Sequence, residues 1–342
     1  MPLAQIRGQE ASVDLISRTL QSNRLPSAWL FSGPPSVGKR LTAQLIAQAL
    51  NCKTHQGLDA CGTCDPCRQI EVGNFADVEL IEPSGQNIRM EQIQEALRWM
   101  QYRPERGHYR VLILDEAERM NRESANAFLK TLEEPPPQTT IILLTTSPML
   151  LLETILSRCQ QVRFQPLSPE ILTDLLAEKT ELANDERNWL MQQGMGSVRL
   201  DLVKDVQDLR ALHSQWGLWL QRIGTSKMIE ILPCCHEWSS AKNLTWERLL
   251  DWLETWLRDL AWLLHELPET ELLNRDQLPA LRKCLQRYSS ESVLALYEAV
   301  LDVRHNIARN ANKTLQLEGL WLRLKNLQEA RKNGCPYCWD AG

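Results

Sequence analysis

The chain has 342 residues, of which 43% are hydrophobic and 24% charged, and its formal net charge is −5. A chain of this length holds two or three domains with ordinary hydrophobic cores, and the acidic balance argues against a protein that grips nucleic acid by electrostatics alone. The first residues contain no apolar signal segment, and no apolar run approaches the ~18 residues of a membrane helix. We therefore expect a cytoplasmic protein that contacts no membrane.

A phosphate-binding pattern follows the first predicted strand, an apolar run at residues 28–31. Gly33, Gly38 and Lys39 stand at the spacing G-x-x-x-x-G-K, and a helical pattern comes next. In this setting backbone N–H groups and a helix N-terminus cradle phosphates. The following position of the pattern is a serine or threonine whose hydroxyl holds Mg²⁺, but here it is Arg40. The sequence therefore predicts a phosphate loop without its magnesium ligand.

Four cysteines come next, at the spacing C-x₈-C-x₂-C-x₂-C: Cys52, Cys61, Cys64 and Cys67. Two chelating C-x-x-C steps that share a sulfur, with a fourth thiolate, suit a tetrahedral Zn²⁺ ion. Four sulfurs leave no open position for a catalytic water, so the predicted zinc site is structural. The alternative is a set of buried or redox cysteines without metal. Glycines and Pro66 are expected to supply turns between them.

A second motif closes a later strand. Residues 78–81 form a short strand candidate, residues 88–102 have helical spacing, and residues 109–114 form a stronger apolar strand. Asp115 and Glu116 end that strand. In a nucleotide site one such acid holds the metal shell and the next polarises water. Two acids after a strand are a weak signal alone, but with the phosphate loop they predict a nucleotide-type core.

The α/β pattern continues to about residue 165. A helical pattern at 121–133 stops at a run of prolines, a buried strand is predicted at 141–144, and a last strand at 161–164. A short helix leads to Ser157-Arg158-Cys159. Strands that alternate with helices predict a parallel sheet covered on both faces.

The rest of the chain reads as helical. Strand-like runs vanish after about residue 207, and seven of the 12 tryptophans lie between Trp216 and Trp262. Trp252, Trp256 and Trp262 are near helical spacing, which fits either base stacking or, as we favour, a packed helical core.

The order of these motifs resembles the subunits of the bacterial sliding-clamp loader, an AAA+ assembly. The resemblance implies an α/β AAA+ core at 1–165 with a zinc-binding insertion at 52–67, an all-α lid at 166–206 and an all-α collar or oligomerisation domain at 207–342. The matching segments are Gly33-x₄-Gly38-Lys39, the four cysteines, Asp115-Glu116-Ala117, Asn126–Pro136, Ser157-Arg158-Cys159, Gly196-Ser197-Val198-Arg199 and Asn310–Leu320.

Departures from the family pattern predict the type of subunit. The motor subunits carry Gly-Lys-Thr and usually Asp-Glu-x-His, whereas this chain has Arg40 and Glu118 at those last positions and stops soon after the collar. It is thus similar to the delta-prime type, the non-hydrolysing stator of a hetero-pentamer. The implied partners are the motor subunits and delta, and, through the assembly, the clamp and primer-template DNA of DNA polymerase III. The alternative is an active ATPase motor subunit of the tau/gamma type, favoured by intact Lys39, Asp115 and Glu116.

The resemblance also assigns roles to single residues. Arg158 matches the family's arginine finger, which acts on a neighbouring subunit's ATP; the alternative is a surface arginine at a helix end. Thr146 matches sensor 1 and Arg199 sensor 2, and without a magnesium ligand we interpret both as structural. We expect ATP and Mg²⁺ to bind weakly or not at all at the degenerate site formed by Gly33, Gly38, Lys39, Asp115, Glu116, Thr146 and Arg199. The tail pair Cys335 and Cys338 lies outside the resemblance. Two interpretations are open for it, half of a second metal site and a redox pair.

Overall fold

The computed structural model describes residues 3–22, 25–54, 59–85, 87–194, 196–198, 200–223, 233, 245–308 and 311–332. The chain divides into two compact units. The first comprises Met1–Lys179 and Gly194–Val198, and the second Thr180–Gln193 and Arg199–Gly342. Among the described helices, none is long and apolar enough to cross a membrane.

A five-stranded parallel sheet forms the centre of the first unit, in the strand order β2-β3-β4-β1-β5. Every residue of β1, β3 and β4 is buried, which explains why their sequences are largely apolar runs rather than alternating patterns. The strands are β1 (Ala28–Ser32), β2 (Val78–Ile81), β3 (Arg110–Leu114), β4 (Thr139–Thr145) and β5 (Gln160–Arg163).

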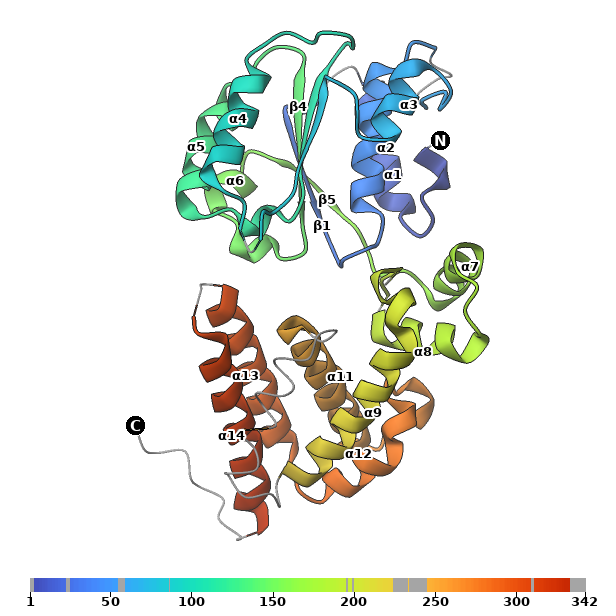
Figure 1. Ribbon diagram of the computed structural model, residues 1–342, viewed down its shortest axis with the longest axis vertical. Coiled ribbons are helices and arrows are strands. Elements are labelled where there is room, and N and C mark those ends of the chain that lie inside the picture. The colour runs from blue at the N-terminus through green and yellow to red at the C-terminus, as the bar shows by residue number, and fades with distance from the viewer. Residues whose placement is uncertain are drawn as a thin grey trace. The chain divides into compact units, whose positions relative to one another are not determined.

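Helices cover both faces of this sheet, with α1, α2 and α3 on one side and α4, α5 and α6 on the other (Figure 1). The first unit therefore has the predicted α/β architecture. Its helices are α1 (Glu10–Gln21), α2 (Lys39–Asn51), α3 (Asp65–Glu71), α4 (Met90–Met100), α5 (Arg122–Glu133), α6 (Glu153–Leu156) and α7 (Pro169–Lys179).

The strand order brings several loops to one edge of the sheet. β4 lies between β1 and β3, and Ser32 at the end of β1 pairs with Thr145 at the end of β4. Because all strands are parallel, the residues that follow their carboxyl ends lie along the same edge. The phosphate loop after β1, the two acids after β3 and Thr146 after β4 share this carboxyl edge. Arg158 precedes β5 and lies at the opposite, amino edge.

The described part of the second unit is helical. Trp216, Trp252 and Trp256 are buried in its core, so the interpretation of the tryptophan series as packed core is confirmed for the last two. Trp262 is half-buried, and its Nε1 donates to the carbonyl oxygen of Pro268 at 2.9 Å. The helices are α8 (Asn184–Gly194), α9 (Val206–Ile223), α11 (Trp246–Leu264), α12 (Leu278–Leu285), α13 (Ser290–Ala308) and α14 (Lys313–Lys332).

These helices agree with the predicted all-α region that follows the sheet. α7 belongs to the first compact unit and nearly all of α8 to the second. The division of the helical region into a lid at 166–206 and a collar at 207–342 stays a prediction.

Candidate functional site

The loop between β1 and α2 has the backbone shape of a phosphate loop. Gly33, Ser36 and Gly38 have positive φ angles of 147°, 54° and 102°. A Cβ atom at Gly33 would lie 2.3 Å from the carbonyl oxygen of Phe164, so this position requires glycine. Gly38 is the left-handed residue immediately before the first turn of α2. The unpaired N–H groups of that turn therefore lie beside the loop.

Lys39 turns back onto this loop. Its Nζ donates to the carbonyl oxygens of Gly33 and Pro34, at 2.6 Å each, and the residue is only 7% exposed. Burial lowers the pKa of Lys39 to about 8, although the carboxylates of Glu118 and Asp115 act in the opposite direction. The ammonium group that the pattern assigns to phosphate is thus held by its own loop.

Asp115 and Glu116 follow β3 beside the loop, and both are half-buried. Oδ1 of Asp115 accepts the backbone N–H of Glu116 at 3.0 Å. Burial raises the pKa of both carboxyls above the ordinary range, and at Asp115 the nearby cations Arg40 and Lys39 oppose this shift. Glu116 has a φ of 49° and forms an ion pair with Arg119. The carboxyl edge therefore carries two partly desolvated acids.

Arg40 spans the gap between the loop and these acids. Its Nη1 forms an ion pair with Glu82 and lies 3.6 Å from Oδ2 of Asp115. The hydroxyl of Thr42 is fully buried and donates to the carbonyl oxygen of Gly38 at 2.8 Å, so it is engaged within α2. Mg²⁺ demands octahedral oxygen ligands, and a guanidinium beside Asp115 repels it. The residues present therefore do not fit a Mg²⁺-nucleotide.

Thr146 is joined to the turn that follows β3. Its backbone N and its Oγ1 donate to Oε1 of Glu118 at 3.0 and 2.7 Å, and Glu118 lies in a 3₁₀ turn, Ala117–Arg119. Neither Glu118 nor Glu82, which follows β2, was predicted as a site residue from the sequence. Because each lies just beyond the carboxyl end of a neighbouring strand, the shared edge of a parallel sheet is the signal that would have found them.

Arg158 lies apart from the six site residues gathered at the carboxyl edge. Its Nη2 is 2.5 Å from Oε1 of Glu133, and its Nη1 donates to the carbonyl oxygen of Thr154 at 2.9 Å. The five residues of β1, rising about 3.3 Å each, separate the two edges. Arg158 therefore does not reach the loop of its own chain. Arg199 and the tail cysteines lie outside the described residues.

The four cysteines of the predicted metal site do converge. Their sulfur atoms all lie within 4.8 Å of one another, with Cys64 Sγ 3.9 Å from Cys52 Sγ and 3.4 Å from Cys67 Sγ. Four Zn–S bonds of about 2.3 Å in a tetrahedron place sulfurs ~3.8 Å apart. Cys61 completes the set, so the cluster has the ligands and the size to hold a metal ion.

Hydrogen bonds stabilise the thiolate form of one of these cysteines. The side chains of Thr54 and Thr63, with backbone N–H groups, lower the pKa of Cys61 to about 5. Burial acts in the opposite direction at Cys67 and raises its pKa. A metal ligand must be deprotonated, so Cys61 is already in the form that binds metal.

The cluster is packed against α2. Cys52 follows the last residue of that helix, and Nε2 of Gln48 donates to the carbonyl oxygen of Cys67 at 2.9 Å. The prediction that Pro66 supplies a turn is wrong, because Pro66 stands in the first turn of α3 and Cys67 lies within that helix. A proline is tolerated there because the N–H it lacks would have no partner inside the helix.

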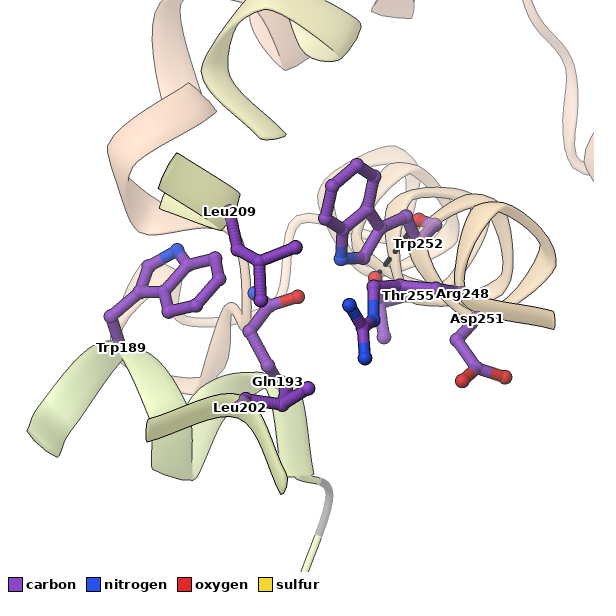
Figure 2. A pocket seen from close by; sticks show the side chains of 8 residues that line it. All are labelled: Trp189, Gln193, Leu202, Leu209, Arg248, Asp251, Trp252 and Thr255. Carbon is purple, nitrogen blue, oxygen red and sulfur yellow. Dashed lines mark hydrogen bonds between the residues drawn. The ribbon is translucent and has the colours of Figure 1, made fainter. Parts of the chain in front are cut away.

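A separate small pocket lies in the second unit, between α8, α9 and α11 (Figure 2). Trp189 Nε1 and Gln193 Nε2 are buried without a hydrogen-bond partner, and Trp252 forms part of the wall. Two N–H donors suit a small acceptor such as a water molecule. We do not assign it to the candidate site.

Two family models match the chain. The model described as DNA polymerase III, delta subunit, matches residues 8–168, and the model described as DNA polymerase III, delta subunit, C terminal, matches residues 206–326.

Relatives of two names match over most of the chain. DNA polymerase III subunit delta′ of Pseudomonas aeruginosa is 30% identical over 324 residues, covering 88% of this chain and 92% of that protein. DNA polymerase III subunit tau/gamma of Haemophilus influenzae is 31% identical over 340 residues, covering 94% of this chain; the chain spans 49% of that relative's length. A solved structure of a DNA polymerase III gamma subunit-related protein from Thermotoga maritima covers 92% of this chain and 99% of its own, with 18% identity and a TM-score of 0.43.

We predict that Lys39 titrates near pH 8 in the folded chain, because desolvation disfavours its ammonium form. NMR of lysine-labelled protein measures the midpoint, with Lys39→Ala to assign the signal. Glu118→Gln should lower the midpoint further, because it removes a carboxylate that stabilises the ammonium.

The lowered pKa also links this lysine to stability. Between pH 8 and 10.5 Lys39 is protonated in the unfolded chain but not in the folded chain, so its contribution makes the free energy of unfolding rise with pH across that window. A midpoint near 10.5, the ordinary value for lysine, would contradict the burial argument.

Proposed function

The chain belongs to the AAA+ clamp-loader family of DNA polymerase III subunits, and on this premise we propose that it is a non-hydrolysing, delta-prime type of subunit. In this role it serves as a stator within the loader and acts on the ATP of a neighbouring motor subunit. As a subunit of the loader, the chain then acts on the clamp and primed DNA through the assembly. The names of its relatives include both delta′ and tau/gamma, so the proposal rests on this chain's own residues.

The observation that carries the proposal is Arg40 at the magnesium-ligand position. ATP hydrolysis by a phosphate loop requires Mg²⁺ on the β- and γ-phosphates, held by the hydroxyl that follows the loop lysine. Here that position supplies a guanidinium, paired with Glu82 and near Asp115. Thr42 does not replace the hydroxyl because its Oγ1 bonds to Gly38 inside the helix. The acids are then retained for charge balance rather than for chemistry.

The position of Arg158 supports a role in trans. It lies at the amino edge, away from the chain's own loop, with its guanidinium partly exposed beside Glu133. A planar guanidinium that bridges phosphate oxygens stabilises the charge that develops on a transferred phosphoryl group. We propose that Arg158 is the arginine finger offered to a neighbouring subunit's ATP. Residues 207–342 are the proposed collar that joins the other subunits.

For the cysteine cluster we propose a structural zinc ion. Four sulfurs that converge at tetrahedral spacing supply a complete ligand set for Zn²⁺, which is why we favour a metal site over an unmetallated or redox cluster. Zinc bound there would stabilise the segment between α2 and α3.

The alternative is an ATPase motor subunit of the tau/gamma type. Lys39, Asp115 and Glu116 are all in place, and the match to the Haemophilus influenzae tau/gamma subunit runs along most of the chain. This alternative requires Arg40 to leave the acids when nucleotide and metal enter.

The first test is ATP turnover by the isolated chain. We expect a rate no higher than background, because the metal ligand is missing. Lys39→Ala, which removes the loop cation, is the matched variant and should not change that rate. Steady hydrolysis that is lost in Lys39→Ala would instead support the motor subunit.

Metal analysis tests the zinc proposal. Protein prepared without chelator should contain about one zinc ion per chain. Cys64→Ser should release it and lower the thermal stability of the first unit, whereas Cys159→Ser, a cysteine outside the cluster, should leave the zinc content unchanged. Metal-free wild-type protein would exclude the zinc site.

Arg158→Ala tests the finger in a reconstituted loader. Folding and assembly should be nearly unchanged, because an exposed ion pair contributes little to stability. Hydrolysis at the neighbouring site should fall by roughly 10³-fold, and Arg158→Lys should recover little of it because lysine lacks the planar fork. Arg103→Ala, at an exposed arginine preceding β3, is the control. Clamp loading and ATP turnover by Arg158→Ala at the unmodified rate would leave Arg158 with a structural role only.

A further inference from the structure

The guanidinium of Arg40 stands in the place of a metal ion. It projects from the second residue of α2, where the family pattern has its magnesium-binding hydroxyl, toward Asp115. In a phosphate-loop site the metal lies between that hydroxyl and an acid that follows a strand. The single nitrogen Nη1 of Arg40 lies near both Asp115 and Glu82. One fixed positive charge thus faces two carboxylates.

Glu82 belongs to this arrangement through the sheet register. Ile81 at the end of β2 pairs with Leu114 at the end of β3, so the residues that follow them, Glu82 and Asp115, are neighbours across two adjacent strands. The N–H of Asp115 donates to the carbonyl oxygen of Ile81 at 2.9 Å, which fixes the two chain ends together. Their side chains therefore converge on one guanidinium from the ends of two paired strands.

The other cation of the site is held by its own loop as well. Lys39 Nζ donates to two carbonyl oxygens of the loop. An incoming Mg²⁺-nucleotide would have to displace Lys39 from these carbonyls, and its metal would meet the charge of Arg40 where it needs oxygen ligands.

We propose that Arg40, anchored by Glu82, is a built-in replacement for the divalent cation that closes the phosphate loop to Mg²⁺-nucleotides. The inference concerns the site on which the proposed function rests and deepens it. The chain keeps the loop, the lysine and the acids, and a single side chain determines that they do not accept metal. Exchanging that side chain for a hydroxyl should open the site.

Equilibrium binding of a fluorescent ADP analogue to the full chain tests this, in Mg²⁺ and in EDTA. The wild type should show no gain in affinity from Mg²⁺. Arg40→Thr should bind at least about tenfold more tightly in Mg²⁺ than in EDTA, and Arg40→Ser provides a second hydroxyl in case the first variant folds poorly. Arg18→Thr removes the same charge from an exposed position on α1 and should behave like the wild type.

Two further variants separate charge from shape. Arg40→Lys keeps a cation and should stay insensitive to Mg²⁺. Glu82→Gln removes the anchor but leaves the guanidinium, and it should not create a metal dependence. Mg²⁺-dependent binding by the wild type, or its absence in both hydroxyl variants, would overturn the inference.

These outcomes are distinct from a failure of the proposed function. Mg²⁺-dependent binding by the wild type without turnover contradicts only the closed loop and leaves a non-hydrolysing subunit intact. Turnover by the wild type contradicts the proposed function itself.

Discussion

Charge balance at the carboxyl edge of the sheet is the constraint on which the account depends. Five parallel strands place a phosphate loop and several acids side by side, and burial makes unpaired carboxylates costly there. Such sites usually take their positive charge from a metal ion that arrives with the nucleotide. In this chain the charge comes from Arg40, which is covalently part of α2. We propose that this guanidinium takes the place of the metal ion in the charge balance of the edge.

The two edges of the same sheet have separate roles in this account. The carboxyl edge holds the closed loop, and the amino edge offers Arg158 beside Glu133. Because a strand separates them, a chain that no longer processes nucleotide at one edge can still act on a neighbour's nucleotide from the other. Helix α2 connects the phosphate loop to the cysteine cluster. It begins at the loop and ends at the cluster, where Gln48 donates a hydrogen bond to the carbonyl oxygen of Cys67.

The sequence predicted those features of the structure whose signal lies in a short stretch of residues, and it missed those that depend on contacts between distant residues. The central strands were readable because strands buried on both faces carry continuous apolar runs, and the cysteines because metal spacing is a local pattern. α3 was missed because Pro66 was interpreted as a turn residue. Glu82 was missed because its role depends on strand register, which pairs residues more than 30 positions apart. The Arg158 contact with Glu133 is also non-local, because it joins the last residue of α5 to the segment between α6 and β5. Motif order could therefore place the arginine in the chain but not name its partner.

Anomalous diffraction from crystals of the full chain grown with Mn²⁺ and ADP tests the central claim most directly. Manganese substitutes for magnesium at oxygen ligands and identifies its own position. The account predicts no manganese peak beside Asp115 in the wild type, with the Arg40 guanidinium still between Asp115 and Glu82, and a peak there in Arg40→Thr. A manganese ion bonded to Asp115 in the wild type, with Arg40 swung away, would contradict it.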